Sequence, residues 1–106
     1  MSIFPLAANL AAVAVGSETL GSIVAPSAAN AVVGLKVSRG LISRDHIIPL
    51  IDWMDVPGPM GRTVTDVAVL LGAMTGADGS TISYSGASAA PEYVYRATVR
   101  ARKSWK

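Results

Sequence analysis

Apolar residues in the first part of the chain fall into short runs separated by small or polar residues. The runs at residues 11–15 and 31–35 are typical of buried strands, and residues 41–43 favour a third strand. Short helices are expected at residues 6–10 and 26–30, because a proline lies in or just before the first turn of each. Short strands and helices are therefore expected to alternate along this part of the chain.

The clearest element is a helix at residues 64–75, where apolar residues recur at helical spacing. Thr63 and Asp66 have the spacing of a capping box, with Asp in place of the usual Glu. Gly76 is suited to end the helix, because glycine readily adopts the left-handed conformation found there. The expected inward face consists of Val64, Val67, Leu70, Leu71 and Met74.

Apolar residues in the stretch 45–60 show neither the helical spacing nor the alternation of a strand. Three prolines lie in this stretch: Pro49, Pro57 and Pro59. Because proline has no N–H to donate, we expect an irregular loop without a regular strand ladder. Trp53 and Met54 are expected to pin this loop to the core.

Composition indicates that part of the surface is covered by something else. Hydrophobic residues make up 51% of the chain and charged residues only 15%, whereas about a quarter is usual for a soluble domain. A partner chain, self-association or the remainder of a larger domain would cover such a surface. The formal charge of +2 is uneven. Residues 1–91 have four basic and six acidic residues (net −2), and residues 92–106 have five basic and one acidic (net +4).

Several classes of site and location are disfavoured. The chain has no cysteine and a single histidine, His46, so we expect no disulfide, no metal site and no cofactor. The apolar stretch at residues 3–15 is shorter than the roughly 20 residues of a membrane span. It also lacks the basic residues that begin a secretory signal. We expect it to be buried core, with no membrane partner and a cytoplasmic location.

A glycine-bounded turn at residues 16–26 follows the first strand and carries the candidate chemistry. If this turn curls, four consecutive backbone N–H groups can converge on an anion or a developing oxyanion: those of Thr19, Leu20, Gly21 and Ser22. The Ser22 hydroxyl would then lie at the mouth of this nest. The alternative is a strand-to-helix connection whose Ser and Thr side chains only cap backbone groups.

The turn resembles the core of the amidase signature family, whose pattern is Gly-[Ser/Thr]-[Glu/Asp]-x-x-Gly-Ser-Ile-x-x-Pro. Here the pattern reads Gly16-Ser17-Glu18-Thr19-Leu20-Gly21-Ser22-Ile23-Val24-Ala25-Pro26. The similarity continues in the family's order through residues 30–36, 40–44, 47–49 and 57–66, and it fades after Gly76. Several pieces in register make this a much more specific match than any one of them.

The resemblance implies an α/β fold in which a mixed sheet is flanked by helices, and this chain would supply a fragment of it. Residues 1–78 would form part of the amidase signature domain, and residues 79–106 a Ser/Gly/Ala-rich linker and a basic tail. The family hydrolyses the carbon–nitrogen bond of amides through a serine acyl-enzyme. The implied partner of the completed enzyme is a small-molecule amide substrate, and no cofactor is implied.

The resemblance also assigns roles within the turn. Ser22 matches the nucleophile, and the backbones of Thr19, Leu20 and Gly21, with that of Ser22, match the oxyanion hole. A serine nucleophile needs a base, which in the family is a buried lysine acting through a second serine. Neither residue has a counterpart in this sequence, so the chain alone is expected to be inactive. Leu20 departs from the family, which usually has a small residue there.

Two other features favour a structural interpretation over a catalytic one. Lys36 matches the lysine of the family's Gly-Leu-Lys-Pro strand end, which is not the catalytic lysine, and its ammonium is expected to be solvated. His46 beside Asp45 suggests a triad with Ser22. Adjacent residues seldom orient each other as a triad requires, so a polar loop is the better interpretation.

Two alternatives to an amide hydrolase stay open. The chain could be a non-catalytic interaction module, in which an apolar piece and the basic tail bind a protein partner. The tail could instead contact nucleic acid, because its five basic residues are interleaved with aromatic ones. No nucleic-acid-binding fold pattern precedes the tail, which weighs against the second alternative.

Overall fold

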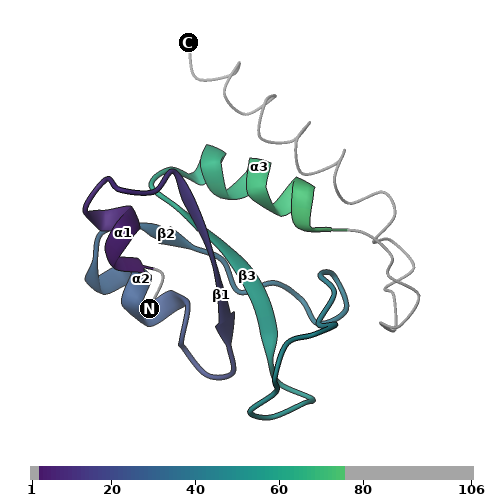
Figure 1. The fold of residues 1–106 in the computed structure, drawn as a ribbon. Coiled ribbons are helices and arrows are strands. Elements are labelled where there is room, and N and C mark those ends of the chain that lie inside the picture. Colours follow the sequence, from purple (N-terminus) through teal and green to yellow (C-terminus); the bar gives the residue numbers. More distant parts are fainter. Residues whose placement is uncertain (1–2, 76–106) are drawn as a thin grey trace.

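A computed structural model of the chain describes residues 3–75 (Figure 1). Its elements are α1 (Ile3–Ala7), β1 (Val13–Glu18), α2 (Val24–Ala29), β2 (Val33–Gly34), β3 (Val56–Gly61) and α3 (Val64–Met74). The α/β class implied by the resemblance is confirmed. The linker and tail predicted at residues 79–106, and the predicted helix stop at Gly76, lie outside the described residues.

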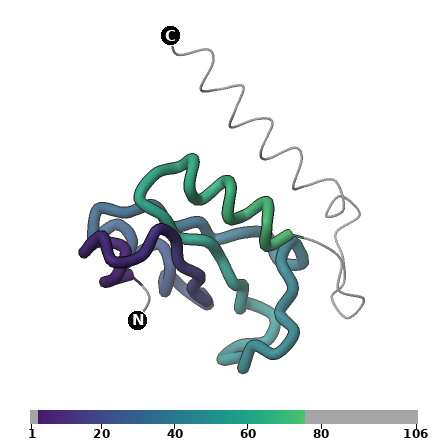
Figure 2. Tube along the Cα trace, turned by 45° about the horizontal axis from the view of Figure 1, so that its top comes forward, coloured from purple at the N-terminus to yellow at the C-terminus, as the bar shows by residue number. Residues whose placement is uncertain are grey.

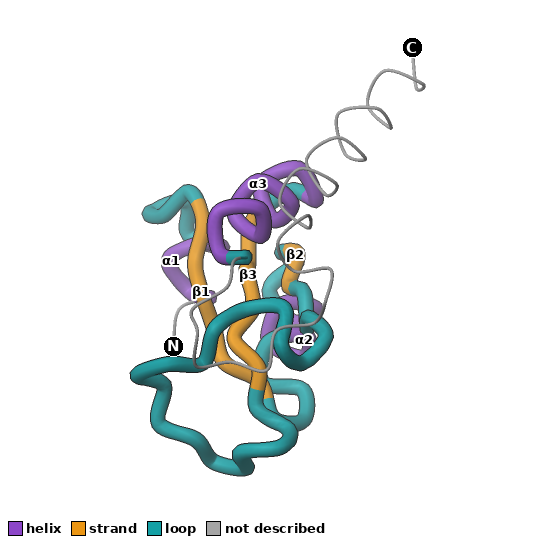
Figure 3. Tube along the Cα trace, turned by 90° about the vertical axis from the view of Figure 1, so that its right-hand side faces the viewer, coloured by secondary structure: helices purple, strands orange, loops and turns teal. Residues whose placement is uncertain are grey.

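The three strands form one sheet with β3 in the middle, in the order β1-β3-β2 (Figure 3). β1 pairs with β3 along its whole length, from Val13 opposite Gly61 to Glu18 opposite Val56. β2 adds only two residues to the other edge of β3. Both pairings within residues 3–75 are antiparallel, so β3 is the element that joins the two sides of the sheet.

The central position of β3 corrects the expectation that residues 45–60 carry no ladder. In an antiparallel strand, the N–H and C=O of one residue point to the same edge, and successive residues alternate. The carbonyl of Pro59 accepts the N–H of Leu35 at 3.1 Å, so Pro59 and Pro57 both face the β2 side. The long ladder with β1 therefore uses the residues that alternate with the prolines, which are Val56, Gly58 and Met60. The missing donors face the side where β2 reaches only the last two residues of β3.

The helices cover opposite faces of the sheet. A Cβ built on Gly58 would contact Ile23, at the start of α2, whereas one built on Gly61 would contact Val67 of α3. Figure 2 shows α3 on one side, with α1 and α2 gathered toward the other. One buried cluster consists of Ile3, Leu6, Ile23 and Met60. The other consists of Val37, Ile42, Val56 and Leu71. β3 contributes to both clusters and is fully buried.

The helix predicted at residues 64–75 is confirmed as α3, and so is its capping box. The Thr63 hydroxyl accepts the N–H of Asp66 at 3.1 Å, and the Asp66 carboxylate accepts the N–H of Thr63 at 3.0 Å. The inward face is rotated from the expected one, because Val64 is exposed. The residues of α3 that are buried are Val67, Ala68 and Leu71.

Other local expectations need correction. Residues 41–43 form no strand, and Ile42 makes only an isolated bridge to Thr75. Trp53 is largely exposed and does not pin its loop to the core. The buried carboxylate of Asp55, at the end of that loop, anchors it instead. Over residues 3–75, no helix is long and apolar enough to cross a bilayer.

Candidate active site

The candidate turn connects β1 to α2 and is shorter than the sequence suggests. Gly16 and Ser17 belong to β1, so the turn itself comprises residues 19–23. Gly21 has φ of 93°, a left-handed conformation that favours glycine. Ser22 follows it and is exposed. The predicted nucleophile therefore lies on the surface, just ahead of a helix.

Glu18, the last residue of β1, is only 2% exposed and organises the turn. Its Oε2 atom accepts the N–H of Ile23 at 2.7 Å and that of Val24 at 2.9 Å. Burial by itself would raise the pKa of Glu18. Backbone N–H groups of the turn and the Lys36 ammonium outweigh that effect and hold the pKa below its ordinary value. Glu18 thus caps α2, whose N-cap residue makes no side-chain cap of its own.

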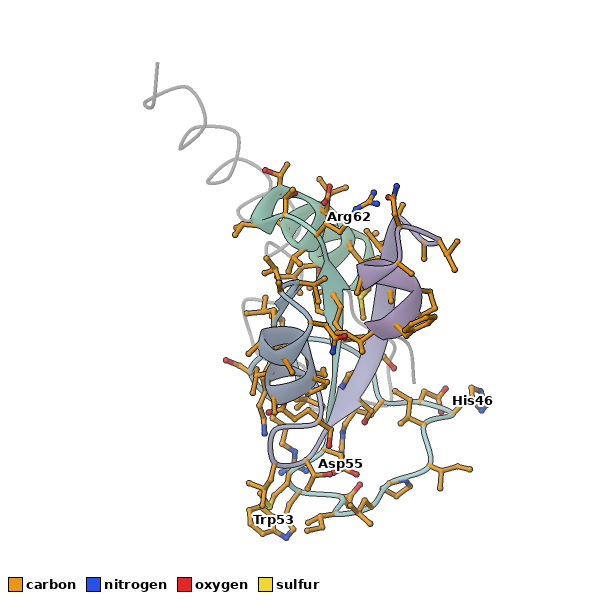
Figure 4. The ribbon with its side chains drawn as sticks, turned by 90° about the vertical axis from the view of Figure 1, so that its left-hand side faces the viewer. His46, Trp53, Asp55 and Arg62 are labelled. Atoms are coloured by element: carbon orange, nitrogen blue, oxygen red, sulfur yellow. The ribbon has the colours of Figure 1, made fainter. Side chains whose placement is uncertain are left out.

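Thr19 is tied to a loop that lies 36 residues further along the chain. Its hydroxyl donates a hydrogen bond to Oδ1 of Asp55, which is 4% exposed. The other carboxylate oxygen accepts the N–H groups of Leu50 at 2.5 Å and Ile51 at 3.0 Å. The Thr19 hydrogen bond is the main reason that the pKa of Asp55 is lowered. Figure 4 shows Asp55 at the end of the sheet where the turn lies.

Lys36, which follows β2, is exposed, in line with the solvated ammonium that the sequence suggests, and it also contacts the turn. Its Nζ atom donates to the carbonyl oxygen of Thr19 at 2.5 Å. The same atom lies 3.6 Å from Oε1 of Glu18, and about a third of the side chain stays exposed. The ammonium is thus engaged by Thr19 and Glu18, on the strand side of the turn, in agreement with a structural role.

Three backbone N–H groups of the turn have no protein acceptor within residues 3–75: those of Thr19, Leu20 and Ser22. The N–H of Gly21, the fourth predicted oxyanion donor, contributes to lowering the pKa of Glu18. The side chain of Leu20 is 78% exposed, so its bulk projects into water. Glu18, and not the side chain of Ser22 or Thr19, caps α2.

His46 lies away from the turn, at the outer side of its loop (Figure 4). His46 is 95% exposed, and its Nε2 atom is 3.5 Å from the Asp45 carboxylate. At the base of the loop, Arg44 pairs with Asp52 at 3.2 Å. The structure fits the polar-loop interpretation. No cluster of three or more potential metal ligands occurs among the described residues.

The sequence did not reveal that Asp55 and Lys36 both bind Thr19 of the turn. Neither residue belongs to a local motif that predicts a contact with the turn. The sheet register explains the contact with Asp55, because Glu18 pairs with Val56 and the next residues, Thr19 and Asp55, then face each other. Only the antiparallel pairing of β1 with the proline-containing β3 would have revealed it.

Comparisons with known proteins show which family has this fold and this turn. A family model described as Amidase matches residues 5–105. The chain is 48% identical over 77 residues to a subunit of the mitochondrial glutamyl-tRNA(Gln) amidotransferase of Anopheles gambiae, covering 73% of this chain and 16% of that protein. A probable amidase of Arabidopsis thaliana is 47% identical over 77 residues, covering 73% and 15%. The chain belongs to the amidase family.

Solved structures give the same result. The peptide amidase of Stenotrophomonas maltophilia is 54% identical with a TM-score of 0.74, covering 76% of this chain and 16% of that one. An amidase family protein of Bacillus anthracis is 52% identical with a TM-score of 0.74, over 76% and 16%. The chain therefore spans about 16% of the length of these relatives.

Proposed function

We propose that this chain carries the nucleophile and the oxyanion-binding turn of an amide hydrolase. The Ser22 oxygen would attack the carbonyl carbon of a small-molecule amide while its proton passes to a base. The carbon–nitrogen bond then breaks, the amine leaves with a proton, and water hydrolyses the acyl-serine. Membership of the amidase family supports this reaction class.

The observation that carries the proposal is the position of Ser22 directly after a left-handed Gly21, beside N–H groups with no acceptor among the described residues. Donors aimed at developing charge stabilise a transition state by about 3 kcal/mol each. We assign the oxyanion hole to the backbones of Thr19, Leu20 and Gly21. Gly21 also has Glu18 as a competing acceptor, so its main contribution is its backbone conformation.

We propose further that the 106-residue chain does not turn over amides by itself. Ser22 needs a general base within hydrogen-bond reach. Lys36 is engaged by Thr19 and Glu18, and His46 lies at the outer side of a distant loop. The base would have to come from outside residues 3–75.

A segment exchange tests this function. Residues 5–75 replace the matching segment of the Stenotrophomonas maltophilia peptide amidase, which shares 54% identity with this chain. We expect the hybrid to hydrolyse peptide amides and Ser22→Ala to reduce the rate to background. Ser38→Ala, at an exposed serine outside the turn, is the matched control and should leave the rate unchanged. A folded hybrid that works equally well with Ser22→Ala would refute the assignment.

A further inference from the structure

The peptide group between Thr19 and Leu20 is held from one side. Lys36 Nζ donates to its carbonyl oxygen, at Thr19. In a trans peptide, the C=O and the following N–H lie in one plane and point in opposite directions. An ammonium that fixes the Thr19 carbonyl therefore aims the Leu20 N–H away from Lys36. That N–H has no acceptor within residues 3–75.

The groups that hold this peptide are themselves fixed. Lys36 lies 3.6 Å from the buried carboxylate of Glu18, which restrains the ammonium. Asp55 takes the hydroxyl of Thr19 and is anchored by two backbone N–H groups of its own loop. Thr19 is therefore held by its carbonyl and by its side chain at the same time, and the peptide plane cannot rotate without breaking one of these bonds.

Lys36 also changes the electronic character of the peptide group. A charged donor on a carbonyl oxygen polarises the amide, and successive hydrogen bonds through one peptide strengthen each other. The Leu20 N–H thereby becomes a stronger donor toward an anion on its free side. Methionine, a neutral side chain of similar length, would supply neither the hydrogen bond that holds the peptide nor the charge that polarises it.

We propose that Lys36 is a positioning residue for the oxyanion site: through the Thr19 carbonyl it orients and polarises the Leu20 N–H. Asp55 supports the same peptide from the Thr19 side chain. This assignment rests on the proposed function, because it gives the Leu20 N–H an oxyanion to bind. It also gives Lys36 a role in the reaction without making it the base.

The first measurement follows the Leu20 amide in the full chain, labelled with ¹⁵N-leucine. The Leu20 signal is assigned by its loss in Leu20→Met. We expect Lys36→Met to move the Leu20 amide proton upfield and Lys36→Arg to restore most of the shift. Arg39→Met removes one positive charge from an exposed residue three positions after Lys36 and should leave the signal in place. An unchanged Leu20 signal in folded Lys36→Met overturns the inference, whatever Ser22 does.

The second measurement adds phenylboronic acid to the same samples. The Ser22 oxygen forms a bond to boron and releases its proton to solvent, which gives a tetrahedral boronate anion next to the turn. We expect the wild-type Leu20 signal to titrate, Ser22→Ala to abolish the titration, and Lys36→Met to weaken binding by about tenfold. A titration that survives Ser22→Ala counts against the proposed function. A Ser22-dependent titration that Lys36→Met leaves unchanged counts against the role of Lys36 alone.

Discussion

Glu18 and Ile23 lie at opposite ends of the candidate turn, and the carboxylate of the first accepts the backbone N–H of the second at 2.7 Å. This bond closes the turn on itself, so that the last residue of β1 fixes the first residues of α2. Glu18 belongs to β1 but caps α2, so the position of Ser22 depends directly on the sheet.

The first prediction concerns the pH dependence of folding. The pKa of Glu18 is lowered in the folded chain, so its ionised form stabilises the fold above its unfolded pKa, which is about 4.3. That contribution is lost as the pH falls from there through the lowered pKa. Glu18→Gln keeps an acceptor but loses the charge, and should cost about 2 kcal/mol at pH 7.

The measurement is denaturant unfolding of both proteins between pH 3 and pH 7 (roughly the span over which carboxylates titrate). The difference between wild type and Glu18→Gln should be constant at neutral pH and shrink as the pH falls. Asp55 has a lowered pKa too and titrates in both proteins, so it cancels in the difference. Asp45→Asn, at an exposed carboxylate, is the control. A difference independent of pH would contradict the role of the Glu18 charge.

The second prediction concerns backbone strain after α2. Ala31 is exposed and has φ of 51°, a left-handed conformation that disfavours residues with a Cβ. Ala31→Gly should therefore stabilise the fold by up to about 1 kcal/mol. Ala28→Gly makes the same chemical change inside α2 and should destabilise it by about 1 kcal/mol. Chemical denaturation of the two variants should give shifts of opposite sign, and shifts of the same sign would refute the strain.

The sequence was informative where a signal is local. The spacing of Thr63 and Asp66 predicted the cap of α3, and the glycine-bounded motif predicted a turn at Ser22. The sequence was misleading where the structure depends on which segments pair with each other. Proline prevents strand pairing only on the edge toward which its missing N–H would point. In β3 that edge faces the short strand β2, so the pairing with β1 is unaffected. The contact of Lys36 with the turn could not be predicted for a related reason, because its acceptors lie 17 residues away in sequence, or further.

The third prediction concerns catalysis by the chain alone. Because no described residue is placed as a base for Ser22, the purified chain should not hydrolyse a panel of aryl amides and aryl esters above background. Ser22→Ala, measured in parallel, should give the same rate as wild type. Clear turnover in the wild type that Ser22→Ala abolishes would contradict this prediction and would show that the chain holds its own base.

The fourth prediction concerns the exposed apolar residues of the loop that precedes β3. Ile48 is 93% exposed, and Leu50 and Trp53 are also largely exposed. The loop is held in shape by the Arg44–Asp52 ion pair and by Asp55, so these side chains are presented to solvent together. Several large apolar side chains exposed on one loop are typical of a surface that another chain covers.

We therefore expect the chain to self-associate at micromolar concentration, and the loop to be the main contact. Sedimentation velocity over a concentration series should show a rising average mass for the wild type. The double variant Ile48→Ser/Trp53→Ser should stay closer to the monomer mass, because removing two large apolar side chains from a contact weakens it by several kcal/mol. Val69→Ser, at an exposed apolar residue on α3, is the matched control and should behave as the wild type. A sharp monomer peak at every concentration, with a cooperative thermal transition, would contradict the prediction. It would also remove the main support for the alternative that this chain is an interaction module.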